Sequence, residues 1–279
     1  RRALRILDGI STSAYHESTL MIAVAGLERA RVAFTHGLDA ESVDAVAFYA
    51  MILTLMGMKR QGARFADIAE HLAERGSHPR THGMTLFVLG ATTTIWTRPA
   101  VDTLTIIRRA FDASTRASDG TYAGYAMGHE VQNLLFQGRP MSEVLAALEQ
   151  RWDVVRGLFP SEKEPPLIVR LFRIQAHQQA LALRGEVHLQ DDLASTDFDP
   201  REHVDELTTS RNAAGLGEWY WKLLLVSMLA DDLEHARSAS DRLRPWEFAT
   251  AGQPFSIDIA MLRALLAART GDAASLKKN

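Results

Sequence analysis

Histidines next to carboxylates are the first side chains in this chain that could carry out chemistry. His16-Glu17 and His129-Glu130 each match half of the His-Glu-x-x-His zinc motif, but neither pair is followed by the second histidine at the required spacing. Adjacent helix positions also point about 100° apart, so a histidine and its neighbouring glutamate do not easily converge on one substrate. An enzyme of an unrecognised helical class, using His129 and Glu130, therefore ranks behind the binding functions considered below.

Three further histidines fall close together in the sequence. His71, His78 and His82 lie within twelve positions, but Pro79 intervenes and no carboxylate converges on them. We expect histidines at helix ends and no metal site.

The motifs of the common catalytic classes are missing from this sequence. The chain has no cysteine, no Gly-Lys dipeptide for a phosphate-binding loop, no protein-kinase motif set and no Gly-x-Ser-x-Gly elbow. We therefore expect a non-enzymatic segment without a cofactor.

One stripe of polar and aromatic side chains is a candidate binding surface. Tyr122, Tyr125, His129 and Gln132 recur at three- and four-residue steps in the stretch 121–137, which indicates one face of a helix. On the inner helix of a repeat protein such a stripe would line a concave groove for a partner or a small molecule. The alternative is that these side chains fill the core with satisfied hydrogen bonds.

A second aromatic cluster follows later in the chain. Trp219 and Trp221 flank Tyr220, and successive aromatics cannot all face inward on a helix. We expect one ring to be exposed or to lie at a helix junction, where Trp219 and Trp221 are candidate contacts for a partner.

The elements that must position these residues are predicted to be helices throughout. Apolar residues recur with helical spacing along the chain, including the stretches 100–117, 121–137 and 141–158, and strand signals are sparse. Tight breaks recur about every 40 to 46 residues. They fall at Gly57, Arg98-Pro99, Gly138-Arg139-Pro140, Arg184-Gly185 and Asp231-Asp232.

This spacing predicts an all-α fold, an α-solenoid of antiparallel helical hairpins with tetratricopeptide-like repeats. A non-repeating helical bundle is the alternative. We expect residues 1–279 to form a single helical-repeat domain, with a bend between sub-stacks 1–160 and 161–279. The acidic stretch 185–199 has no Lys or Arg, and we expect a solvated loop that caps the next helix.

The net charge and the lengths of the apolar runs limit the kinds of partner that this chain is expected to bind. Lys plus Arg number 31 and Asp plus Glu 34, a net charge of −3 that argues against nucleic acid. No apolar run reaches the roughly 18 residues that a membrane span needs. We expect a cytoplasmic fragment of a larger protein, with no membrane insertion.

The stretch 118–126 (Ser-Asp-Gly-Thr-Tyr-Ala-Gly-Tyr-Ala), together with 134–140 (Leu-Leu-Phe-Gln-Gly-Arg-Pro) and 142–144 (Ser-Glu-Val), resembles part of a known group of proteins. These are large multidomain signalling ATPases that join a Ser/Thr kinase domain, an AAA/NACHT-like (STAND) ATPase module, a long helical region, a GAF domain and a sensor histidine kinase. The resemblance is to their tetratricopeptide-like helical region. It continues upstream through 96–99 and downstream to 229–236. The kinase, nucleotide-binding and histidine-kinase motifs of such proteins are absent here, so none of their catalytic residues carries over.

The resemblance implies a regulatory and scaffolding domain of a signal-transduction ATPase or kinase. Such a domain would act through protein–protein or interdomain contacts, with flanking domains or a signalling partner protein. The alternative is a small-molecule sensor in which Tyr122, Tyr125, His129 and Gln132 face a ligand in the concave groove.

Overall fold

The structure is a computed structural model, and it describes residues 6–7, 19–40, 42–162, 164–250 and 252–271. His16 and Glu17 lie outside these residues. The described chain is all-α, as predicted, apart from an isolated bridge between Ser195 and Phe198. None of its helices is long and apolar enough to cross a membrane.

The chain divides into two compact units, Arg1–Ala176 and His177–Asn279, with the division inside helix α10 (Leu167–Leu183). The predicted single domain with a bend near residue 160 stays a prediction.

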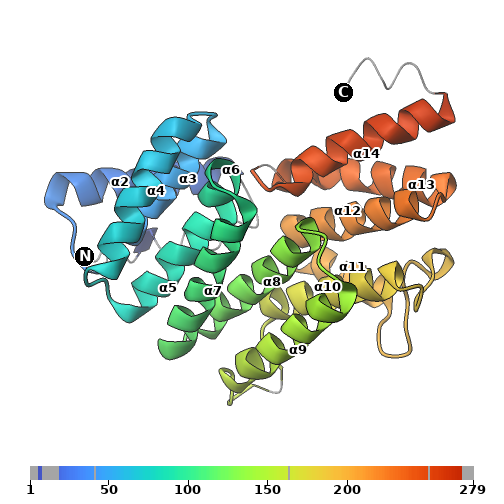
Figure 1. Cartoon of the computed structure of the whole chain (residues 1–279), viewed down its shortest axis with the longest axis horizontal. Coiled ribbons are helices and arrows are strands. Elements are labelled where there is room, and N and C mark those ends of the chain that lie inside the picture. Colours follow the sequence, from blue (N-terminus) through green and yellow to red (C-terminus); the bar gives the residue numbers. More distant parts are fainter. Residues whose placement is uncertain (1–5, 8–18, 41, 163, 251, 272–279) are drawn as a thin grey trace. The chain divides into compact units, whose positions relative to one another are not determined.

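The first unit is a succession of helices in which each packs against its neighbours along the chain (Figure 1). Contacts also join helices that are not consecutive, α3 with α5 and α5 with α8. A π-helical segment, Leu89–Thr93, interrupts the helical stretch between α5 and α6. The helices are α2 (Thr19–His36), α3 (Asp44–Leu55), α4 (Lys59–Glu74), α5 (Pro79–Val88), α6 (Thr94–Thr97), α7 (Ala100–Arg116), α8 (Gly120–Phe136) and α9 (Met141–Gly157).

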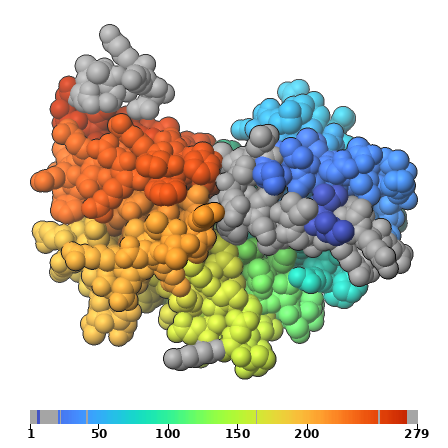
Figure 2. Space-filling model, turned by 180° about the vertical axis from the view of Figure 1, so that it is seen from behind, coloured from blue at the N-terminus to red at the C-terminus, as the bar shows by residue number. Residues whose placement is uncertain are grey.

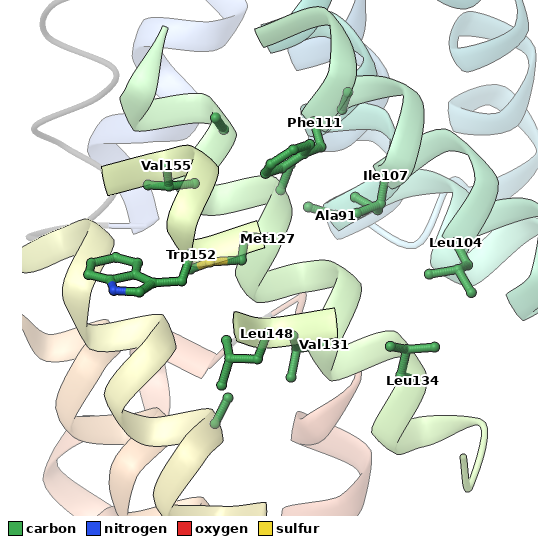
Figure 3. Packing of buried hydrophobic residues seen from close by; sticks show 14 of the residues in the cluster. Ala91, Leu104, Ile107, Phe111, Met127, Val131, Leu134, Leu148, Trp152 and Val155 are labelled. Atoms are coloured by element: carbon green, nitrogen blue, oxygen red, sulfur yellow. The ribbon is translucent and has the colours of Figure 1, made fainter. Parts of the chain in front are cut away.

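The main core of the first unit is built by successive helices. Phe111 of α7, Met127 of α8 and Trp152 of α9 belong to one buried cluster, and Figure 3 shows their side chains pointing into it. Ile107 and Leu148 are fully buried in the same cluster. Because each helix contributes to the burial of the next, no single hairpin could bury its apolar face alone.

The second unit is organised around α12 (Ala213–Leu229), which packs against α11 (Pro200–Thr209), α13 (Leu233–Leu243), the 3₁₀ segment Arg244–Thr250 and α14 (Phe255–Thr270). Figure 2 shows the opposite face of the chain, where α13 and α14 form the orange-to-red surface.

The acidic segment 185–199 is a loop with a 3₁₀ turn at Leu189–Asp191. Leu193 is fully buried and anchors this loop. As predicted, the loop caps the next helix, because the Asp199 side chain accepts a hydrogen bond from the backbone N–H of Arg201 at the start of α11.

One turn geometry recurs between the helices of both units. A residue with positive φ follows the helix, its N–H binds the carbonyl three positions back, and the next N–H binds the carbonyl five positions back from itself. This pair of bonds satisfies carbonyls that the helix end would leave without partners. The positive-φ residues in these turns are Gly57, Ser118, Gly138, Gly185, Arg211 and Asp231.

Candidate functional site

Helix α8 carries the predicted stripe, and two glycines set its position. An added Cβ on Gly124 would lie 2.5 Å from the Val169 side chain, and one on Gly128 would lie 2.4 Å from the Phe172 ring. Both contacts are shorter than carbon atoms tolerate, so α8 and α10 approach more closely than larger residues would allow. The glycine pair is therefore a packing device between these two helices.

The rings of the stripe belong to an aromatic cluster. Phe87 of α5 lies 5.7 Å from Tyr122, 5.5 Å from Tyr125 and 5.2 Å from His129, measured between ring centroids. Phe172 of α10 closes the cluster at 5.9 Å from both Tyr125 and His129. Tyr122 and His129 are buried, and Tyr125 keeps part of its ring exposed. Tyr125, Phe87 and Phe172 are the partly exposed members of the cluster, so a ligand would reach the cluster at these rings.

Gln132 is the last residue of the stripe and lies in the protein interior. Its side chain is buried, and its Nε2 has no hydrogen-bond partner. A buried amide nitrogen without a partner costs about 1–3 kcal/mol, so this group is a ready donor for any acceptor that reaches it.

His129 and Glu130 have separate surroundings. While His129 joins the rings, the Glu130 carboxylate accepts hydrogen bonds from Arg108 Nε at 2.7 Å and from Arg151 Nε at 2.9 Å. Arg151 also stacks on the Phe111 ring, 4.2 Å from its centroid. Glu130 is buried, and it ties α7 and α9 to α8 by charge-assisted bonds.

A second set of ion pairs lies on α4. Glu70 accepts hydrogen bonds from Arg98 at 2.8 Å and from Arg109 at 2.6 Å. Burial disfavours the charged carboxylate, but the two guanidinium groups outweigh that cost and lower the pKa of Glu70.

The clustered histidines are not brought together as ligands. His82 is half-buried, and its pKa is lowered by burial and by the positive charges of Arg109 and Arg116. Within the described ranges, no group of three or more His, Asp or Glu side chains could hold a metal ion.

The tryptophans of the second cluster lie in the interior of the second unit. Trp219 packs edge-on against His203 and Phe198, with centroid distances of 5.3 and 5.5 Å. Trp221 stacks on Phe255 of α14 at 4.7 Å. Both tryptophans are buried, as is Tyr220 between them. Helix α12 packs against α11, α13, α14 and both 3₁₀ segments of this unit, so successive rings are all covered.

Helix α12 also contains a buried ion pair that was not predicted from the sequence. Lys222 binds Glu218, one turn earlier on the same helix, and both side chains are largely buried. Burial lowers the pKa of the Lys222 ammonium, while Glu218 acts in the opposite direction. The sequence signal for this ion pair is the spacing of four residues between Glu218 and Lys222, which places both on one helix face.

A cavity of about 250 Å³ lies between α12, α13 and the 3₁₀ turn of the acidic loop. Its lining mixes apolar side chains, hydroxyl groups and charges of both signs: Leu189, Gln190, Asp192, Leu223, Ser227, Glu234, His235, Ser238, Ala239 and Arg242. No periodic pattern in the sequence indicates this site, because its residues come from three separate segments.

Comparison of this chain with protein families, curated proteins and solved structures finds no match.

Proposed function

We propose that this chain is a non-catalytic regulatory and scaffolding helical-repeat domain of a signal-transduction ATPase or kinase. It works through contacts with flanking domains or with a signalling partner protein. The observation that supports the proposal is one turn geometry that recurs at six helix ends, four of which are breaks that divide the sequence into similar lengths.

The proposed architecture is an α-solenoid of tetratricopeptide-like hairpins. In its support, the breaks at Gly57, Gly138, Gly185 and Asp231 all have the same two-bond turn, and the break at Arg98 ends α6. Contacts of consecutive helices from α2 to α9 and from α11 to α14, and of α3 with α5, α5 with α8 and α12 with α14, match stacked hairpins.

A repeated apolar position offers a surface for the partner. Leu55, Phe136 and Leu229 each stand two residues before the positive-φ residue of such a turn, and each is exposed. Large apolar side chains exposed at the same place in several repeats are typical of binding surfaces.

The regulatory role rests on the resemblance of residues 118–144 to the helical region of multidomain signalling ATPases. In that setting, the flanking ATPase and kinase domains are the first partners to test.

The test is co-purification of this chain with separately expressed flanking domains of its parent protein. Phe136→Asp should weaken the complex at least tenfold if Phe136 is buried on binding, because an aspartate there removes apolar burial and adds a desolvation cost. Val154→Asp, at an exposed apolar position near the end of α9 that no positive-φ turn follows, is the control and should bind as the wild type does. Equal binding by all three proteins, or binding by none, would contradict the proposal.

The alternative function, a small-molecule sensor at the α8 stripe, is favoured by one observation. The unpaired Nε2 of Gln132 lies at the buried end of a ring cluster whose member Tyr125 is partly exposed. A ligand there would need an acceptor for that amide. Gln132→Leu would abolish a ligand-induced rise in melting temperature if the amide makes this contact, and would leave the rise intact if the ligand binds elsewhere.

A further inference from the structure

The cavity of the second unit is lined by charged and polar side chains as well as apolar ones. One wall is α12, with Leu223 and Ser227, and the opposite wall is α13, with Ala239 and Arg242. Asp192, the residue directly after the 3₁₀ turn of the acidic loop, also lines the cavity. Loop and helices are joined there by an ion pair between Arg242 and Asp192 at 3.1 Å.

Ser227, whose buried hydroxyl group has no hydrogen-bond partner, is among the residues that line this cavity. Ser227 is only 1% exposed, and its Oγ makes no hydrogen bond. A buried polar group that lacks a partner costs free energy, and such groups in folded proteins call for an explanation. A ligand atom that exchanges a hydrogen bond with Ser227 would remove this cost.

The charges that face the cavity have both signs. Arg242 gives one of its five N–H donors to Asp192, and Asp192 retains acceptor capacity beyond that bond. On the same helix, Glu234 adds a carboxylate and His235 an imidazole whose Nδ1 lies 2.8 Å from Asp232. A ligand with a single negative charge would face two carboxylates, and one with a single positive charge would face the guanidinium.

The volume of the cavity and its apolar lining residues restrict the size and the chemical class of the ligand further. Pockets for drug-sized molecules are about 300–1,000 Å³, and this cavity of about 250 Å³ is smaller. Leu189, Leu223 and Ala239 provide an apolar surface for a short aliphatic group.

We propose that this cavity binds a small zwitterion, a free α-amino acid with an aliphatic side chain. Its carboxylate binds Arg242, its ammonium group binds Asp192, Ser227 hydrogen-bonds to the ligand, and the aliphatic group covers Leu223. The site does not depend on the regulatory role proposed above, and it is distinct from the α8 stripe.

The experiment is isothermal titration calorimetry of the full chain with leucine, 4-methylpentanoate and 3-methylbutylamine. Leucine carries both charges, and each of the other two probes keeps the aliphatic group with one charge only. We expect saturable binding of leucine, and binding of each single-charge probe weaker by tenfold or more, as expected for the loss of a charged hydrogen bond. No saturable binding of leucine, or equal binding of all three probes, would overturn the proposal without any variant.

Variants locate the binding site. Arg242→Gln and Ser227→Ala should each weaken leucine binding, and Arg237→Gln, an exposed arginine on α13 outside the cavity, should not. Circular dichroism and the melting temperature check that each variant folds. Ser227→Ala removes only a hydroxyl without a partner, so it should not destabilise the fold. Leucine binding that is unchanged in both cavity variants would place the ligand elsewhere and overturn the proposed site.

Discussion

At the residue scale, the first unit is tied together by carboxylates that each bind two arginines. Glu130 of α8 and Glu70 of α4 each accept hydrogen bonds from two arginines of other segments. A buried charge without a partner destabilises the fold. Removing Glu130 or Glu70 should therefore lower the free energy of unfolding more than the loss of an exposed ion pair does.

Glu130→Gln should lower the free energy of unfolding by about 2 kcal/mol, because the amide can no longer neutralise Arg108 and Arg151 across the helices. Urea unfolding monitored by circular dichroism measures this change. The matched control is Glu143→Gln, which removes the exposed pair between Glu143 and Arg139 and should cost less than about 0.5 kcal/mol. Equal losses in the two variants would show that the buried position of Glu130 brings no added stability.

The stabilising effect of Glu70 should depend on pH. Its folded pKa is lowered from the ordinary value of 4.5, so its contribution is present above that value and is lost as the pH falls through the folded pKa. Glu70→Gln should therefore be less stable than the wild type at pH 7. The difference should shrink toward zero in acid, when the wild-type carboxyl is also neutral. Chemical unfolding of both proteins across this pH range gives the measurement. A difference that stays constant with pH would mean that the charge of Glu70 is not its cause.

At the element scale, glycines decide how closely two helices pack. Gly128 of α8 faces the Phe172 ring at a distance that no Cβ could occupy. Gly157, at the end of α9, has open space around the position of an added Cβ. The same substitution at these two positions should thus have opposite effects.

Gly128→Ala should destabilise the chain by about 1–3 kcal/mol, because α8 and α10 must move apart or the ring must leave its position. Gly157→Ala should stabilise it by up to about 1 kcal/mol, because alanine restricts the unfolded chain and favours the helix. Thermal unfolding of the two variants beside the wild type checks both signs. A neutral Gly128→Ala variant would show that the contact between α8 and α10 is loose.

At the scale of the whole molecule, the division into two compact units predicts local unfolding. Interactions in stacked helices are mostly between neighbours, so a destabilising substitution in one unit need not unfold the other unit. Each unit has its own buried residues, Leu148 in the first and Leu224 in the second.

Leu148→Ala should cost about 2–5 kcal/mol and should raise amide hydrogen exchange in α7, α8 and α9. Exchange in α12 and α13 should stay close to that of the wild type. Hydrogen exchange read by mass spectrometry resolves these segments. A uniform rise across both units would mean that the chain unfolds as one cooperative body.

The sequence by itself determined the fold class and much of the helix pattern. The stretches 100–117 and 141–158 correspond to α7 and α9 within one residue, because apolar periodicity and the prolines before each helix are local signals. The turns at Ser118 and Arg211 carry no glycine, and their positive φ became visible only in the structure. The sequence signal for these two turns is the helix-capping residue that follows each of them, Asp119 before α8 and Asn212 before α12.

The directions in which the candidate residues point depend on packing between helices and were not predictable from the sequence. The spacing of Tyr122, Tyr125, His129 and Gln132 places them on one helix face, but neighbouring helices determine whether that face is covered. Phe87 and Phe172, distant in sequence, bury most of it. The cavity beside Ser227 is likewise invisible in the sequence, since it forms only where three segments meet. Periodicity is a property of one element, whereas burial and cavities arise between elements.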